Sequence, residues 1–109
     1  MNGFRGGFGG ANMQNILRQA QKMQEDMEKA QAELVDTMVE GTAGGGMVTV
    51  TMNCKKENIS FKLKKEAVDP DDIEMLEDLL KAAFLDASKK AEEISGEKLG
   101  AFGNLGGLM

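Results

Sequence analysis

The stretch Met47-Val48-Thr49-Val50-Thr51-Met52 decides the fold, because alternate side chains along it fall on opposite faces of an extended chain. Residues 59–63 repeat the pattern, with apolar Ile59, Phe61 and Leu63 alternating with polar neighbours. A short turn over residues 53–56 joins these two strands, and residues 35–40 predict a third strand before them. The three strands form an antiparallel sheet with one apolar face that needs cover.

The segment before the sheet predicts a long helix over residues 12–34, with Asn12 as its N-cap. Its apolar residues recur at intervals of three and four, the heptad spacing of a helix that packs along one narrow seam: Met13, Ile16, Ala20, Met23, Met27, Ala30 and Leu34. A Met-rich peptide groove is the alternative interpretation of this seam. Helix packing explains the strict spacing better, and an apolar seam without a partner favours self-association.

The segment after the sheet predicts a second long helix, with Asp69 as its cap, Pro70 in the first turn and Gly96 as its end. Its apolar face is broad: Ile73, Leu76, Leu79, Leu80, Ala83, Phe84, Ala87, Ala91 and Ile94. The fold class is therefore α+β, with a long N-terminal helix, a three-stranded antiparallel sheet and a long C-terminal helix. We expect one domain over residues 12–96, between flexible glycine-rich segments at residues 1–11 and 97–109.

Two local patterns have a functional and a structural interpretation. The glycine-rich residues 41–46 could cradle a phosphate, but they precede a strand and no Gly-Lys-Ser/Thr follows, so we predict a hairpin connection. Asp69, Asp71 and Asp72 could begin a calcium loop, but Glu74 stands where such a loop needs glycine. Helix capping explains these acids better.

Composition excludes most catalytic chemistry. The chain of 109 residues is 41% hydrophobic and 28% charged, has no His, Trp or Tyr, and has one cysteine, Cys54. Imidazole bases, His or thiolate metal sites and disulfides within the chain are thereby excluded. We expect no enzyme activity, no cofactor, no small-molecule substrate and no functional role for Cys54. No apolar run is long enough to span a membrane and the first residues lack a signal-peptide core, so we expect a cytoplasmic protein.

The charge distribution is uneven. The net charge is −5, and the excess acid lies after residue 64. The candidate DNA-contacting residues are the basic side chains of both predicted helices and of the third strand: Arg18, Lys22, Lys29, Lys55, Lys56, Lys62, Lys64, Lys65, Lys89 and Lys90. The plain alternative is a solvated surface on which helical lysines pair with acids four residues away, as in Glu25/Lys29, Glu77/Lys81 and Asp86/Lys90. Charge alone does not predict nucleic-acid binding for an acidic chain.

Three runs resemble the bacterial YbaB/EbfC family of nucleoid-associated proteins. They are ILRQAQKMQEDMEKAQAEL at residues 16–34, VEGTAGGGMVTVTMN at 39–53 and DPDDIEMLEDLLKAAFLDA at 69–87, and the core MLEDLLKAAFLDA is the most specific. The resemblance implies an intertwined or tweezer-like homodimer that binds double-stranded DNA with little sequence preference and alters its conformation. It further implies a place in the nucleoid, effects on nucleoid organisation and gene expression, and no catalytic activity.

Two departures from the family pattern concern the third strand. Cys54 stands where relatives commonly have glycine, and Lys64-Lys65 stands where they often have Asp-Pro. The family has no short DNA-reading motif to transfer, so the ten contact residues are chosen by charge. A protein-interaction adaptor for a replication or repair partner is the alternative function.

Overall fold

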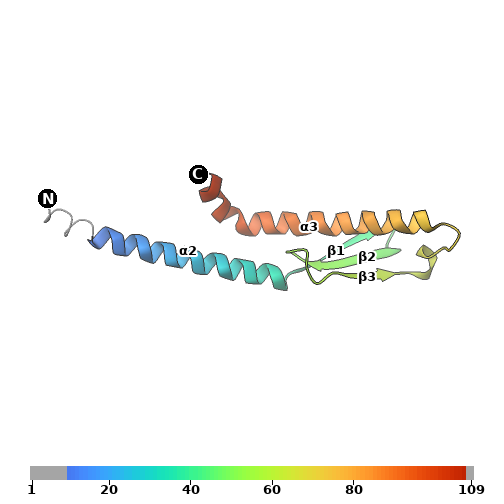
Figure 1. The fold of residues 1–109 in the computed structure, drawn as a ribbon, viewed down its shortest axis with the longest axis horizontal. Helices are drawn as coiled ribbons and strands as arrows, with labels where there is room; N and C mark the ends of the chain where they lie inside the picture. Colours follow the sequence, from blue (N-terminus) through green and yellow to red (C-terminus); the bar gives the residue numbers. More distant parts are fainter. Residues whose placement is uncertain (1–9, 108–109) are drawn as a thin grey trace.

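The computed structural model describes residues 10–107 as two long helices and one small sheet (Figure 1). The elements are α2 (Gly10–Asp36), β1 (Met38–Ala43), β2 (Val48–Asn53), β3 (Ser60–Leu63), the 3-10 turn η2 (Lys65–Ala67) and α3 (Ile73–Gly107). The predicted α+β class and element order are confirmed. The molecule is elongated, about 83 Å along its longest axis. Helix α2 projects beyond the sheet as an arm, whereas α3 covers the sheet with its first part and then continues past the sheet beside the inner end of α2.

The sheet is antiparallel, with β2 between β1 and β3. Gly41 pairs with Val50, and Val50 pairs with Phe61 on the other side. Because opposite residues share a face, one face of the sheet carries the apolar side chains. Val48, Val50 and Met52 on that face are fully buried. The alternation in residues 47–52 therefore predicted the core strand correctly.

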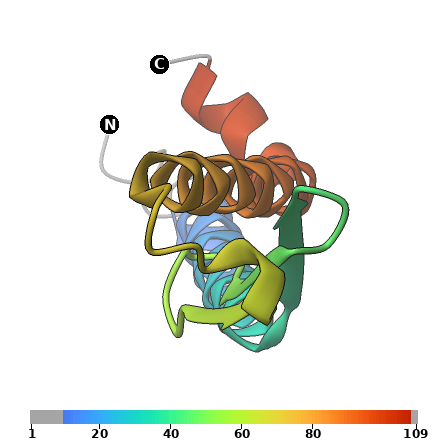
Figure 2. The same ribbon diagram turned by 90° about the vertical axis from the view of Figure 1, so that its right-hand side faces the viewer.

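Helix α3 covers this apolar face (Figure 2). Small residues allow the helix to approach the strands closely. Ala83, Ala87 and Ala91, four residues apart, have no exposed surface. A Cβ atom at Gly41 of β1 would lie only 2.2 Å from the Ala83 carbonyl oxygen and from the Ala87 nitrogen. The strand and the helix can approach this closely only because position 41 has no side chain.

The predicted strand over residues 35–40 is displaced, because α2 continues to Asp36 and β1 runs from Met38 to Ala43. Long-range backbone bonds determine this boundary: the Cys54 N–H donates to the carbonyls of Leu34 and Thr37 at 3.1 and 3.0 Å. The predicted turn holds Cys54, but its thiol is buried. Only the second half of the predicted glycine loop is a turn, since Gly44, Gly45 and Gly46 have positive φ.

Three predicted helix boundaries are wrong. Helix α2 begins at Gly10, so Asn12 is not its N-cap. Asp72 caps α3 by accepting a hydrogen bond from the Met75 N–H at 3.1 Å, whereas Asp69 accepts one from the Asp71 N–H in the preceding turn. Helix α3 passes through Gly96 and ends at Gly107, so most of the segment predicted as a flexible tail is helical. Residues 1–9 and 108–109, the rest of the two glycine-rich segments, lie outside the described residues.

The seam of α2 divides into two parts. Ala30 and Leu34, at the end near the sheet, are buried. Further out along the arm, Met13, Ile16, Met23 and Met27 are between 39% and 58% exposed in the single subunit. The heptad pattern thus predicted the helix and its inner packing, and the outer seam remains partly exposed in the single subunit.

Candidate nucleic-acid interface

The outer part of α2 carries positive charge without any acid. Residues 10–24 contain Arg18 and Lys22, and the first acidic residue of the helix is Glu25. Asn15, Arg18, Gln19 and Lys22 recur at helical spacing and line one open hollow on the arm. All four side chains are exposed. Two cations and two amides therefore present a row of hydrogen-bond donors that can contact phosphate oxygens.

The inner part of α2 is different, because its one lysine stands among acids. Lys29 is exposed, and its charge contributes to lowering the pKa of Glu33. The main cause of that shift is the Lys98 ammonium of α3, which donates a hydrogen bond to Glu33 and forms an ion pair with it. This ion pair joins the base of the arm to α3. The surroundings of Lys29 are therefore less positive than those of Arg18 and Lys22.

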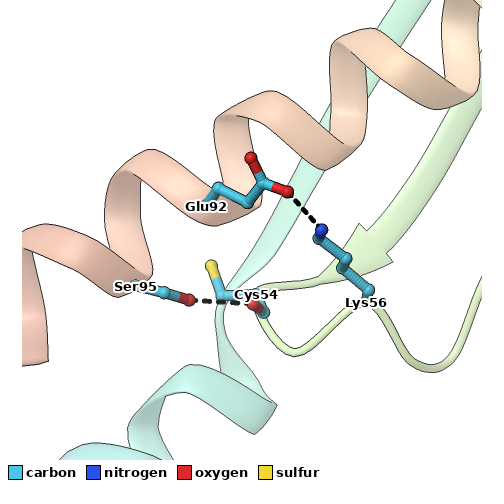
Figure 3. A network of polar contacts seen from close by, with 4 residues as sticks. All are labelled: Cys54, Lys56, Glu92 and Ser95. Carbon is cyan, nitrogen blue, oxygen red and sulfur yellow. Dashed lines mark hydrogen bonds and ion pairs between the residues drawn. The ribbon is translucent and has the colours of Figure 1, made fainter.

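The turn between β2 and β3 holds two of the predicted lysines, Lys55 and Lys56. Asn53 builds this turn, since its side-chain oxygen accepts hydrogen bonds from the N–H groups of Lys55 and Glu57 at 3.0 and 2.9 Å. Lys56, in a left-handed conformation, forms an ion pair with Glu92 of α3 (Figure 3). Lys55 is exposed.

A second polar contact connects the turn between β2 and β3 to α3. The Ser95 hydroxyl donates a hydrogen bond to the Cys54 carbonyl at 2.9 Å (Figure 3). Since the Cys54 N–H bonds to the end of α2, one residue connects the arm, the turn and α3. Burial raises the pKa of the Cys54 thiol, which favours its protonated form.

The face of the sheet turned away from α3 is hydroxyl-rich. Phe61 and Leu63 lie on the α3 side with Leu80, so alternation places Lys62 on the opposite face. There it pairs with Thr49, and Ser60 pairs with Thr51. Lys64 and Lys65 follow β3 at the far end of the sheet and are exposed. Hydroxyl groups can hydrogen-bond to phosphate oxygens, and a search by charge alone misses them. The strand alternation already placed Thr49 and Thr51 on one face.

Lys89 and Lys90 of α3 have unlike surroundings. The Lys90 Nζ lies 3.4 Å from the Asp86 Oδ2, which confirms the predicted pair. The same ammonium donates a hydrogen bond to the Glu40 carbonyl oxygen at 2.8 Å. The Asp86 carboxylate also accepts a hydrogen bond from the Thr42 N–H at 3.0 Å, and this bond is the main cause of its lowered pKa. Lys90 and Asp86 thus occupy the free edge of β1. Lys89 is exposed.

The ten predicted residues are all exposed, but a single subunit does not gather them onto one surface. Arg18 and Lys22 lie together on the arm, and the others are spread over the length of the sheet and α3. Two of them, Lys56 and Lys90, are held by acids of α3. The remaining acidic excess lies around the start of α3: Asp69, Asp71, Asp72, Glu74, Glu77 and Asp78.

Neither a metal cluster nor a membrane segment is found in the described part of the chain. Within residues 10–107, no three Cys, Asp or Glu side chains are grouped so that they could hold a metal ion. No helix over the same residues combines the length and apolar character needed to cross a bilayer.

These features define an elongated α+β protein with a projecting helical arm whose outer part is basic. The chain belongs to the YbaB/EbfC DNA-binding family, whose sequence model matches residues 9–107. The resemblance drawn from residues 16–34, 39–53 and 69–87 is thereby confirmed.

Relatives with similar sequences are named nucleoid-associated proteins. One from Bacillus cytotoxicus is 58% identical over 98 residues, which cover 90% of this chain and 88% of the relative. Another, from Alkaliphilus metalliredigens, is 51% identical over 98 residues, covering 90% of this chain and 86% of the relative. Among solved structures, the uncharacterized protein HP0035 from Helicobacter pylori matches with a TM-score of 0.67 and 26% identity, covering 83% of this chain and 92% of that one.

Proposed function

We propose that this protein is a non-enzymatic nucleoid protein that binds double-stranded DNA as a homodimer, through phosphates and with little sequence preference. By altering the conformation of the bound DNA it contributes to nucleoid organisation and gene expression. The bacterial relatives named nucleoid-associated proteins support the cytoplasmic, nucleoid location.

The observation that carries the proposal is the acid-free outer arm. Arg18 and Lys22 lie on one exposed face with Asn15 and Gln19, and no carboxylate precedes Glu25. Phosphate contacts come from Arg, Lys, Asn and Gln side chains and carry no sequence information. An outer arm that offers such donors and no carboxylate over residues 10–24 favours binding to any duplex.

A homodimer strengthens this binding because it supplies two arms. One arm with two cations contacts few phosphates, and few contacts give weak binding at physiological salt. Two arms on the same duplex make the second contact intramolecular, which raises the overall affinity without new chemistry. If the dimer neutralises roughly five phosphates, the slope of log K against log salt is about −4 to −5.

The test removes equal charge from two places. The variant R18Q/K22Q removes two cations from the outer arm, and the matched control K56Q/K90Q removes two that are held by acids. We expect R18Q/K22Q to make the salt slope shallower by about 3 and to weaken binding to unrelated duplexes by similar factors. The control should change the slope by less than about 1.

Equal effects of the two variants would contradict the assignment to the arm, because net charge alone would then explain binding. Light scattering and thermal unfolding of each variant separate lost contacts from lost structure. A wild-type protein that is not retained on DNA at physiological salt, but keeps protein partners after nuclease treatment, would support the adaptor alternative instead.

A further inference from the structure

The direction of the arm depends on a short stretch at its base. Every residue from 12 to 29 is exposed, and burial of α2 begins only at Ala30 and Leu34. The Cys54 N–H bonds to the carbonyls of Leu34 and Thr37, which holds the point where α2 ends. Such bonds fix the position of a helix end but leave the helix axis free to tilt. The tilt is therefore decided by contacts on the side of the helix over residues 30–36.

One polar side-chain contact joins this base to α3. Helix α3 continues past the sheet beside the inner end of α2 (Figure 1), and there Lys98 forms an ion pair with Glu33. Among residues 12–100, no other ion pair or side-chain hydrogen bond connects the two helices. The Lys98 ammonium lowers the pKa of Glu33, so both partners are charged at neutral pH.

The length of the arm magnifies any change of tilt. Arg18 lies fifteen residues before Glu33, about 22 Å along the helix. A tilt of about 15° at the base therefore moves Arg18 by about 6 Å. A hydrogen bond between a cation and a phosphate oxygen spans only about 2.8 Å, so this displacement removes the cation from the phosphate that it contacts.

We propose that Glu33 and Lys98 are positioning residues, whose ion pair directs the arm and thereby sets the path of the bound DNA. The proposal rests on the DNA-binding homodimer of the proposed function and extends it to residues that need not touch DNA. With two arms on one duplex, the direction of each arm decides where Arg18 and Lys22 of the two subunits meet the phosphates. The same cations on redirected arms hold the duplex in a different conformation.

A second ion pair of α3 provides the matched control. Glu92 pairs with Lys56, which belongs to the turn between β2 and β3 and not to the arm. Both ion pairs are partly exposed, with side chains between 36% and 64% exposed. Glu33→Lys and Glu92→Lys therefore break one exposed ion pair each and change the net charge by the same amount.

The first measurement follows the arms without DNA. Gln21→Cys, at an exposed position of α2, carries one spin label on each arm of the dimer, and the buried Cys54 takes up little label. Pulsed electron resonance then gives one arm-to-arm distance. We expect Glu33→Lys to shift the mean distance by at least about 5 Å, the displacement of position 21 for a tilt of about 15°. Glu92→Lys and the swapped pair Glu33→Lys/Lys98→Glu should keep the wild-type distance.

The second measurement follows the DNA. A duplex of about 30 bp with a fluorophore at each end reports its end-to-end distance by energy transfer when it is saturated with protein. Glu33→Lys should lose at least half of the wild-type change in transfer, and the swapped pair should recover it. Glu92→Lys should match wild type. An ion pair with a purely structural role would lower the thermal stability and leave both readouts unchanged.

Wild-type distances and transfer in Glu33→Lys overturn the proposal, even where DNA binding stands. A shift that the swapped pair fails to reverse also overturns it, because the shape of residue 33 rather than the ion pair would then direct the arm. Lys98→Gln removes the pair without adding repulsion and should broaden the distance distribution, so it replaces Glu33→Lys if circular dichroism shows that variant unfolded. If wild type does not bind DNA, the proposed function fails, while the arm-to-arm distances still decide the role of the ion pair.

Discussion

Replacing Gly41 with alanine should separate α3 from the sheet. The new Cβ would lie 2.2 Å from two backbone atoms of α3, whereas ordinary contacts begin at 3.4 Å. Backbone atoms cannot rotate away as a side chain can, so the helix must retreat by about 1.2 Å, the difference between these two distances. That shift loosens the packing of Ala83 and Ala87, which are fully buried.

The expected cost is at the upper end for an overpacked core, about 3 kcal/mol in the free energy of unfolding. Typical domains have only about 5 to 15 kcal/mol in total, so this loss is a large fraction of the stability. Urea unfolding followed by circular dichroism, at one fixed protein concentration, measures the free energy for wild type and Gly41→Ala.

Gly96→Ala is the matched control, because nothing lies within 4 Å of a Cβ at that position of α3. Alanine is the better helix former, so this variant should gain about 0.5 to 1 kcal/mol. If Gly41→Ala loses less than about 1 kcal/mol, the close strand-helix contact does not limit stability and the reasoning is refuted.

Three further predictions concern single polar groups. Ser88→Ala removes a buried hydroxyl that has no hydrogen-bond partner in the described chain, so the free energy of unfolding should stay unchanged or rise slightly. Ser95→Ala removes the hydrogen bond to the Cys54 carbonyl and should lower the free energy of unfolding by about 1 kcal/mol. The Thr42 N–H lowers the pKa of Asp86, so the stability that Asp86 contributes is complete above the ordinary Asp pKa and is lost as pH falls through the lowered one. Urea unfolding should therefore show wild type and Asp86→Ala converging in acid, and a difference independent of pH would contradict this. Ellman's reagent should modify native Cys54, which is 3% exposed, at least about tenfold more slowly than the unfolded chain.

Local periodicity predicted most of the fold because each element repeats its own pattern. The alternation in residues 47–52 identified the buried strand, and the heptad spacing before residue 34 identified the arm. The boundary between them depends on the Cys54 N–H, which bonds to Leu34 and Thr37 from a distant part of the sequence. A pattern within residues 35–40 cannot reveal that contact.

Gly41 shows why a local rule can fail. Glycine weakens an isolated strand, so residues 41–46 read as a loop. In the folded chain, the absence of a side chain at Gly41 allows α3 to approach β1 closely. The small residues Ala83 and Ala87 lie at this contact on the α3 side. The spacing of the alanines in α3 was visible in the sequence, but their partner on β1 was not.

The sequence identified the basic residues of the candidate interface, but it did not show which of them lie together and which are paired with acids. The pair Asp86/Lys90 followed from the four-residue spacing on one helix, and it is present at 3.4 Å. Lys56 and Glu92 form an ion pair although they lie far apart in the chain. A spacing rule for one helix cannot predict such a pair, so the sequence did not show that Lys56 is paired with an acid. Of the cations of α2, Arg18 lies farthest from an acid along the helix, and its neighbour Lys22 precedes Glu25 by one turn.

The distance between charges resolves the conflict between an acidic chain and a polyanionic ligand. Arg18 lies 18 residues before the end of α2, about 27 Å along the helix from the sheet. The acidic start of α3 lies beyond the sheet, at the opposite end of a molecule about 83 Å long (Figure 1). At physiological salt, electrostatic interactions decay over about 8 Å, so those acids hardly affect a phosphate at the arm. For DNA lying against the outer arm, the charges within that distance govern attraction, namely Arg18 and Lys22 with Glu25 and Asp26 about one turn beyond Lys22, and the net charge of −5 governs solubility instead.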